Sequence, residues 1–424
     1  MKKSVMVLLT AFVTFAVLFA GGAKENTATV KDSDVNLTIA IWDKNQEPGL
    51  TKIVQDFTAK TGIKARIQVT PWEQYWTMLE AGATGGSLPD IFWMHSNEFA
   101  RYAEYKMLLD LTGRISASKN IDMSKFPKDI VALYNAGGKQ YAMPKDIDTI
   151  ALWYNKTMFD KAGIKYPDAS WTWDTFRDAA KKLTKTDGSQ YGCAIRPDNN
   201  QAGWYNIVFD MGGEIVSSDK KKSGFDKAGT IKALTFMETV IKDGSMPPYN
   251  VLAENKAEAL FEAGKVAIVT MGSWMLAELC NNDYVKANGD IAVLPKDAVS
   301  GRRASIYNGL GWAAAANTKY PEQAWKLIEY FGTKEAQTKQ SDLGIVISAF
   351  DGSVKNWVSA YPKFNLQAYL DMMADMVIRP YSKSTVAWEN MSIEKSVDLW
   401  TGKKSASAVC KEIASEMNKI LAEE

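Results

Sequence analysis

Aromatic and polar side chains follow the ends of two predicted strands near the start of the chain. Trp42 and Asp43 come directly after an alternating apolar run, and Trp93 and His95 stand at the end of a second apolar run. Aromatic rings can bind a small molecule through their faces, and polar groups can bind it through hydrogen bonds. These four residues are therefore the first candidates for a ligand site.

The elements that must position these residues alternate as strand, helix, strand, helix and strand. Residues 37–41 and 65–69 alternate as strands do, and residues 91–94 form a short apolar run. Between the first two, apolar residues recur at helical spacing from 50 to 57 before Gly62, and a second helix opens after Pro71. This order predicts a parallel sheet with right-handed crossovers, in which a ligand crevice lies beyond the carboxyl ends of the strands.

Asp146 and Asp148 raise the alternative of an enzyme. Glycosidases work with two carboxyl groups that flank the substrate. Residues two apart in an extended segment, however, point the same way at a spacing of roughly 7 Å, with no opposing partner across a substrate. The sequence also contains no G-x-S-x-G elbow, phosphate loop or H-E-x-x-H motif. We therefore expect a binding protein without a cofactor, and a secreted glycosidase is the distant alternative.

Five short motifs carry a resemblance to a known family. They are IWD at 41–43, LPDIFW at 88–93, MPKDIDTIALWYNK at 143–156, VTMGSW at 269–274 and NGLGW at 308–312. In this order the chain resembles the extracellular solute-binding proteins of ABC importers, and specifically the sugar-binding branch that includes the maltodextrin-binding proteins. The resemblance implies a monomer that passes a sugar to the permease subunits of an ABC transporter in the membrane.

The resemblance also implies a fold class. This is an α/β fold of the two-lobed periplasmic-binding-protein type (type II), with a mostly parallel sheet flanked by helices in each lobe and the ligand cleft between the lobes. We expect the first lobe over 36–147 and 303–348, and the second over 148–302 and 349–424. The return to the first lobe is taken from the family, since the periodicity of the sequence does not show it.

A sugar ring has apolar C–H faces and a hydroxyl-lined edge, so flat aromatic rings and charged or amide groups suit it. The resemblance aligns Trp93, Trp274 and Trp388 with sugar-stacking aromatics and Asp148 with an acidic sugar ligand. The complete set of predicted ligand-binding residues is Trp42, Asp43, Trp93, His95, Asp146, Asp148, Trp204, Tyr205, Trp274, Asn308, Trp312, Arg379 and Trp388.

Other ligands stay open for the same fold. A glycerophosphodiester would need convergent basic residues or helix N-termini around its phosphate. A polyamine would need several acidic residues around its ammonium groups. The mixed aromatic and acidic set favours a neutral sugar, a di- or oligosaccharide, but the sequence does not identify which one.

Composition excludes several function classes. The 50 Lys and Arg residues and 49 Asp and Glu residues leave a net charge of +1, which argues against nucleic acid or an anionic membrane as the main partner. Cys193, Cys280 and Cys410 are far apart and have no nearby His, so we expect no metal site. Whether two of these cysteines pair stays open. A chain of 424 residues is long enough for two lobes with separate cores.

The N-terminal residues predict export. Lys2 and Lys3 precede an apolar run over 5–20 and the small residues 21–23, which together predict a signal peptide over 1–23 and a polar linker over 24–35. Many lipoprotein relatives have a Cys where this chain has Gly22. We therefore expect a periplasmic or extracellular protein without a lipid anchor.

Overall fold

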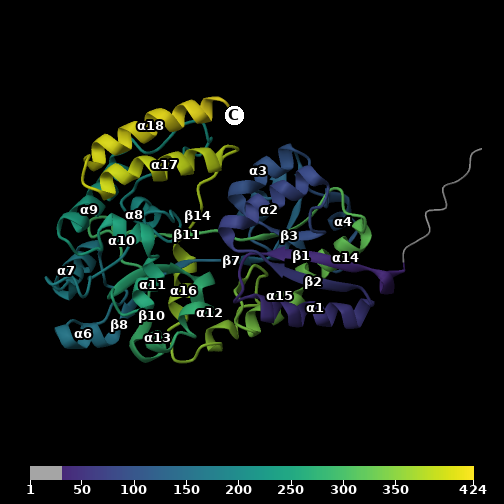
Figure 1. Cartoon of the computed structure of the whole chain (residues 1–424), viewed down its shortest axis with the longest axis horizontal. Coiled ribbons are helices and arrows are strands. Elements are labelled where there is room, and N and C mark those ends of the chain that lie inside the picture. Colours follow the sequence, from purple (N-terminus) through teal and green to yellow (C-terminus); the bar gives the residue numbers. More distant parts are fainter. Residues whose placement is uncertain (1–30) are drawn as a thin grey trace, which may run out of the picture. The chain divides into compact units, whose positions relative to one another are not determined.

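The computed structural model describes residues 31–424 (Figure 1). The predicted signal peptide and most of the predicted linker lie outside the described residues. The end of the linker belongs to the fold, which its polar composition did not predict. Residues Asp32–Asp34 form a 3-10 turn, the Asp32 carboxylate accepts a hydrogen bond from Gln323 at 3.0 Å, and Val35 is fully buried.

A five-stranded sheet contains the predicted strand-helix repeat. Its strand order is β2-β1-β3-β12-β6. The first three strands in the chain pair in parallel, as expected, whereas β12 runs antiparallel to both β3 and β6. The bounds are β1 (Asn36–Ile41), β2 (Lys64–Val69), β3 (Ile91–Met94), β6 (Ala142–Pro144) and β12 (Gly311–Ala314).

Helix α1 (Glu47–Thr61) shows why this region folds as the sequence predicts. Its buried residues Leu50, Ile53, Val54 and Phe57 recur on one face, which packs against the sheet. The helix ends at Gly62, where a φ of 78° allows the left-handed turn and the backbone N–H bonds back to Thr58.

Other helices flank this sheet, and Figure 1 draws α2 and α3 above its strands and α1 and α15 below them. Helix α14 packs on β12 and β6, and it runs from Pro321 to Gly332 as predicted. The bounds of the remaining helices here are α2 (Trp72–Gly85), α3 (Ser96–Glu104), α4 (Thr112–Ala117), α5 (Lys128–Leu133), α14 (Pro321–Gly332) and α15 (Lys334–Asp342).

A second, three-stranded sheet has the order β10-β8-β9. Both pairings are antiparallel, so the expectation of a mostly parallel sheet is wrong for this part of the chain. The strands are far apart in sequence, and side-chain alternation does not fix the direction of strands that are not joined by a short connection. The bounds are β8 (Ile150–Asn155), β9 (Ile268–Gly272) and β10 (Gly289–Ala292).

The two longest helices of the C-terminal part, α17 and α18, pack along each other and against α9 (Figure 1). Helix α7 begins after Thr172, whose side chain caps it as predicted. The bounds are α6 (Lys156–Ala162), α7 (Trp173–Leu183), α8 (Tyr205–Asp210), α9 (Ala228–Lys242), α10 (Tyr249–Glu254), α11 (Ala257–Glu262), α12 (Leu276–Leu279), α13 (Asp283–Asn288), α16 (Gln367–Asp371), α17 (Thr385–Trp400) and α18 (Ala406–Ala422).

Small two-stranded ladders lie where the chain crosses between the two larger sheets. Strand β7 follows β6 and leads into β8, and β11 follows β10 and leads into β12. Strand β7 pairs with β13, and β11 pairs with β14. The bounds are β7 (Asp146–Ile147), β11 (Ser305–Tyr307), β13 (Ile347–Ser348), β14 (Met376–Ile378) and, in a separate hairpin, β4 (Asn135–Ala136) and β5 (Lys139–Gln140).

None of the helices over residues 31–424 combines the length and the apolar character that crossing a membrane requires.

Candidate functional site

The crossing segments bring polar side chains from distant parts of the chain together. Asp148 pairs with Asn308 in an isolated antiparallel bridge. Strands β11 and β14 pair in parallel, so Asn308 and Arg379 leave the ladder at the same end. Three of the predicted site residues therefore meet where the two sheets join.

His95 reaches this point from the first sheet. It follows β3 and caps α3, where its Nδ1 atom accepts a hydrogen bond from the Asn97 N–H at 3.2 Å. Its Nε2 atom lies 3.1 Å from the amide nitrogen of Asn308. Burial and the charge of Arg379 lower the pKa of His95 well below its ordinary value, so the ring is neutral near pH 7.

The tautomer of His95 follows from these contacts. A neutral ring that accepts at Nδ1 carries its proton on Nε2, and this N–H needs an acceptor. The Asn308 amide supplies one when its oxygen is turned toward the ring, because the two amide atoms are interchangeable in position. As placed, with its nitrogen toward the ring, the Asn308 amide has a buried oxygen that lacks a partner among residues 31–424.

The Asp148 carboxylate is held by its neighbours. It accepts hydrogen bonds from the Asn308 N–H at 3.1 Å and from the Gln201 side chain. Burial, and next the charge of Asp146, raise the pKa of Asp148 well above its ordinary value. This side chain can therefore accept hydrogen bonds, and it can also donate one when it is protonated.

Arg379 forms a buried ion pair with Glu389 on α17. Its Nη2 atom lies 2.8 Å from each carboxylate oxygen, and both side chains are more than nine-tenths buried. Asn97 on α3 donates to the same carboxylate at 2.8 Å, and the Asn200 side chain also forms a hydrogen bond with it. The term polar cluster is used below for His95, Asn97, Asp148, Asn200, Gln201, Asn308, Arg379 and Glu389.

Several polar atoms of this cluster lack a hydrogen-bond partner within residues 31–424. They are Nε and Nη1 of Arg379 and the side-chain oxygens of Asn97, Asn200 and Asn308, and all are buried. A buried polar atom without a partner usually costs about 1–3 kcal/mol, so such atoms are uncommon and seldom gather at one place. Their grouping marks a site that can take donors and acceptors from a ligand.

A second series of hydrogen-bonded polar side chains lies close to the first sheet. The Lys145 ammonium group contacts the Asp146 carboxylate at 2.5 Å and the Gln46 amide oxygen at 2.9 Å, and Gln46 donates to Asp43 at 2.9 Å. The same ammonium group lies 4.5 Å from the centre of the Trp93 ring. Asp43 and Asp146 are thus connected through Gln46 and Lys145, and each carboxylate accepts a hydrogen bond within the protein.

Aromatic rings lie beside His95 at the carboxyl ends of β1 and β3. The Trp42 ring lies 4.9 Å from Trp93 and 6.3 Å from His95, measured between ring centres. Trp72 lies 5.4 Å from His95 and is 39% exposed. The parallel strands therefore bring Trp42 and His95 together, as their positions in the sequence predicted.

Trp274 follows β9, a strand of the second sheet. It is partly exposed, and its ring packs directly on Gly272, where a Cβ atom would collide with it. The N–H of the preceding residue, Ser273, donates to Thr149 at 3.0 Å, next to Asp148 in the chain. The residue before Trp274 is thus hydrogen-bonded to the residue after Asp148.

Other predicted stacking residues are buried in this structure. Trp312 stacks on Phe331 at 4.2 Å, and Trp388 donates through Nε1 to Ser382 at 2.8 Å. Trp204 packs edge-on against Tyr205, whose hydroxyl accepts from Asn200 at 3.1 Å. The structure does not present the rings of Trp93, Trp204, Tyr205, Trp312 or Trp388 to solvent, and their role in ligand binding stays a prediction.

The predicted set of ligand-binding residues left out four members of the polar cluster. Glu389 follows the predicted Trp388, Asn97 lies two residues after His95, and Asn200 and Gln201 precede Trp204. Each omitted residue is thus a near neighbour of a chosen aromatic residue or His95. The signal that could have found them is the run of short polar residues beside those positions.

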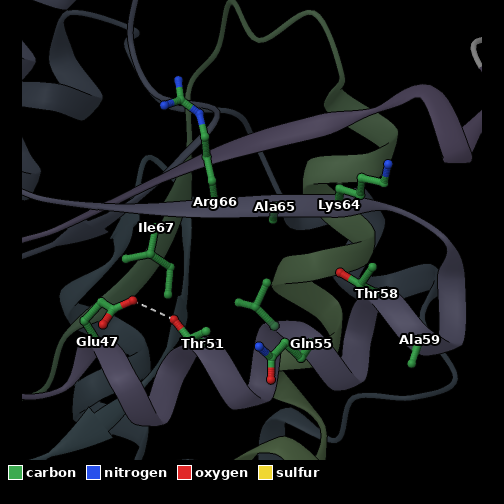
Figure 2. Close-up of a pocket in the computed structure, with 10 residues that line it drawn as sticks. Glu47, Thr51, Gln55, Thr58, Ala59, Lys64, Ala65, Arg66 and Ile67 are labelled. Carbon is green, nitrogen blue, oxygen red and sulfur yellow. Dashed lines mark hydrogen bonds between the residues drawn. The ribbon is translucent and has the colours of Figure 1, made fainter.

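Two surface hollows lie elsewhere. One, of about 590 Å³, lies between α1 and β2, and Figure 2 shows its polar lining residues, including Glu47, Thr51 and Arg66. Thr51 donates to Glu47 at 2.7 Å, and the polar side chains there are all at least partly exposed. The other, of about 550 Å³, is lined mainly by apolar residues around Tyr249 and Trp400. Neither hollow gathers buried polar groups as the polar cluster does.

The cysteines settle the pairing question that the sequence left open. Cys193, Cys280 and Cys410 are all buried and unpaired in the described structure. Burial raises the pKa of each thiol, that of Cys410 to about 12. No group of three or more His, Cys, Asp or Glu side chains within residues 31–424 is arranged to hold a metal ion.

Comparisons with known proteins give the family and the fold. Residues 43–338 match the model of the family described as bacterial extracellular solute-binding protein. The arabinooligosaccharide-binding protein of Bacillus subtilis is 24% identical over 361 residues, which cover 80% of this chain and 78% of that protein.

Two solved structures are similar in fold. The ABC substrate-binding protein of Listeria monocytogenes in complex with cycloalternan superposes with a TM-score of 0.84 at 24% identity, covering 92% of this chain and 99% of that one. The GacH receptor of Streptomyces glaucescens, solved unliganded and with acarbose, has a TM-score of 0.80 at 18% identity, covering 91% and 98%. These likenesses confirm the predicted α/β periplasmic-binding-protein fold.

Proposed function

We propose that this chain, which belongs to the bacterial extracellular solute-binding protein family, binds a di- or oligosaccharide and delivers it to the membrane permease of an ABC importer. The family consists of transport components and not of enzymes, so the expectation of a non-enzymatic protein is confirmed.

The observation that carries the proposal is the group of unpartnered buried atoms in the polar cluster. Arg379 offers the N–H groups of two nitrogens, and Asn97 and Asn200 offer acceptor oxygens, none of which has a partner among residues 31–424. Each sugar hydroxyl both donates and accepts, so neighbouring hydroxyls can satisfy donors and acceptors that stand side by side. Hydrogen bonds to the charged guanidinium would be the stronger ones.

Aromatic residues near His95 and near the segment of Asp148 support a ligand with apolar faces. Trp42 and Trp72 stand beside His95, and Trp274 is anchored next to the segment of Asp148. A sugar ring that stacks on such side chains buries area with little loss of rotamer freedom. A di- or oligosaccharide has more than one ring face and could therefore contact both groups of aromatic residues.

Relatives support the same ligand class. The names of similar proteins refer to arabinooligosaccharides, galactooligosaccharides and maltodextrin, at 24% identity in each case. The spread of these names leaves the identity of the sugar in this chain open. We assign no single sugar.

The mode of action that we propose is closure of two lobes around the sugar, with the lobe boundaries predicted from the sequence. Asp43 and Trp93 belong to the first predicted lobe and Trp274 to the second. A ligand that contacts both lobes favours the closed form by its difference in affinity for the two forms. The permease could then distinguish loaded from empty protein by shape.

A thermal-shift screen of the mature protein tests the ligand class. The panel contains mono-, di- and oligosaccharides, polyamines and glycerophosphodiesters. A ligand at 100 times its dissociation constant adds about 2.7 kcal/mol of stability, which is readily measured. Stabilisation by a di- or oligosaccharide supports the proposal. Stabilisation by a polyamine or a phosphodiester alone would contradict it.

A further inference from the structure

We propose that Glu389 sets the charge class of the ligand, because it neutralises the Arg379 guanidinium that faces the site, so that the site accepts neutral sugars and rejects sugar acids. This inference rests on the proposed function and adds a specificity-determining residue to it. Glu389 was not among the residues predicted from the sequence.

The first step is the geometry of the ion pair. A single nitrogen of Arg379, Nη2, contacts both oxygens of Glu389 at 2.8 Å. Arginine commonly meets a carboxylate with two nitrogens, which uses the whole edge of the guanidinium. Here Nε and Nη1 have no partner within residues 31–424. The pair therefore cancels the charge of Arg379, while the three N–H groups on Nε and Nη1 stay available.

The second step is the ionisation state of the Glu389 carboxyl group. Its oxygens face donors, namely Arg379 and the amide group of Asn97 at 2.8 Å. Burial raises the pKa of Glu389, whereas the charge of Arg379 and the hydrogen bonds from Arg379, Asn200 and Asn97 oppose that rise, because only the ionised form accepts from all of these donors. Asn97 lies on α3 and Glu389 on α17, so the carboxylate is fixed from two elements that are distant in sequence.

The third step is the charge balance around the site. The other buried cation, Lys145, is paired with Asp146 at 2.5 Å. Asp43 and Asp148 bring further carboxyl groups, so cations do not exceed anions among these residues. A sugar carboxylate or phosphate entering the site would thus meet no uncompensated positive charge. An uncharged hydroxyl would meet the free donors of Arg379 without that penalty.

The burial of the pair makes the effect of its loss large. Both side chains are more than nine-tenths buried, where a charge that loses its partner is poorly compensated by solvent. Removing the charge of Glu389 leaves the Arg379 cation in need of an anion. Among sugars, a uronic acid supplies such an anion, because it carries a carboxylate on a ring with hydroxyl groups.

The test compares wild type with Glu389→Gln in the full mature chain. Calorimetry and thermal shift compare the affinity and the stabilisation that galactobiose gives with those that digalacturonate gives. The same comparison is made between maltose and maltobionate. We expect Glu389→Gln to shift the preference toward the acidic member of a pair by about tenfold or more, as expected for a buried charge match. In both proteins, inorganic sulfate is compared with chloride at equal ionic strength, and only the variant should gain stability from sulfate.

A matched control removes a carboxylate elsewhere. Glu335→Gln breaks the pair of Glu335 with Lys60, whose side chains are 55% and 49% exposed. This control should keep the wild-type preference and gain nothing from sulfate. A folded Glu389→Gln protein that gains neither sulfate stabilisation nor affinity for the acidic sugars overturns the inference.

A second variant keeps the inference testable if Glu389→Gln does not fold. Arg379→Gln leaves the carboxylate without its cation, and we expect it to shift preference toward galactosamine over galactose by about tenfold. No shift in a folded Arg379→Gln protein also overturns the inference. If wild type binds no sugar but Glu389→Gln binds sulfate, the proposed function fails and the charge role of Glu389 stands.

Discussion

Asp148 and Asn308 are joined by two hydrogen bonds in opposite directions. The Asp148 N–H donates to the Asn308 carbonyl at 3.0 Å, and the Asn308 N–H donates to the Asp148 carboxylate at 3.1 Å. Both use backbone atoms of Asn308, so its side-chain amide is left for His95 and for a ligand. The carboxylate and the amide are thereby fixed at neighbouring positions by the crossing segments themselves.

Replacement of Asn308 by Ala should weaken sugar binding while the fold is kept. The backbone bonds to Asp148 do not depend on the amide, whereas a hydrogen bond to the ligand would be lost at a cost of about 1–2 kcal/mol. Calorimetry with the sugar found in the screen measures the loss. Asn356→Ala is the matched control, since Asn356 is exposed and its side chain bonds only to Asp342 among the described residues. Equal affinities in the two variants would remove Asn308 from the site.

Replacement of Asp148 by Ala should weaken binding by about 1.5–3 kcal/mol, the range for hydrogen bonds that involve a charged group. Glutamine 201 would lose a partner, but the backbone bridge to Asn308 stays. The dissociation constant is again measured by calorimetry, with circular dichroism to check the fold. An unchanged dissociation constant would give Asp148 a structural role only.

The stability of Asp148→Asn should depend on pH in a defined direction. The folded protein holds the pKa of Asp148 above its ordinary value, so wild type loses stability as the pH rises from about 4 toward the raised pKa. Asparagine does not titrate. The variant should therefore become more stable relative to wild type as the pH rises, by at most about 1.4 kcal/mol per pH unit. Urea unfolding of both proteins at pH 4, 6 and 8 measures this difference, and a constant difference would refute the assigned shift.

Replacement of Gly272 by Ala should displace Trp274. The indole ring occupies the space of the new methyl group, so we expect about 1–3 kcal/mol of destabilisation and weaker sugar binding. Gly113→Ala is the control, because a Cβ atom there meets nothing within 4 Å and alanine favours its helix. Chemical unfolding and intrinsic fluorescence report both effects. Wild-type stability in Gly272→Ala would mean that Trp274 does not rest on Gly272.

The sequence predicted which site residues lie at the carboxyl ends of the parallel strands. Trp42 and His95 meet because β1 and β3 are parallel and both residues follow their strands. It could not separate Trp204 or Trp388 from the core, since the direction of a ring depends on packing from elements far away in the chain. Asn97 and Glu389 are 292 residues apart, and no local pattern indicates that α3 and α17 touch. Contacts of that kind are set by tertiary packing alone.

A crystal structure of the mature protein with a di- or oligosaccharide from the screen tests the central claim most directly. The account predicts sugar hydroxyls within hydrogen-bond distance of Nε or Nη1 of Arg379 and of the Asn308 amide, with a ring face against Trp42, Trp72 or Trp274. Sugar bound only in the hollow between α1 and β2, with the polar cluster unchanged, would contradict it (Figure 2).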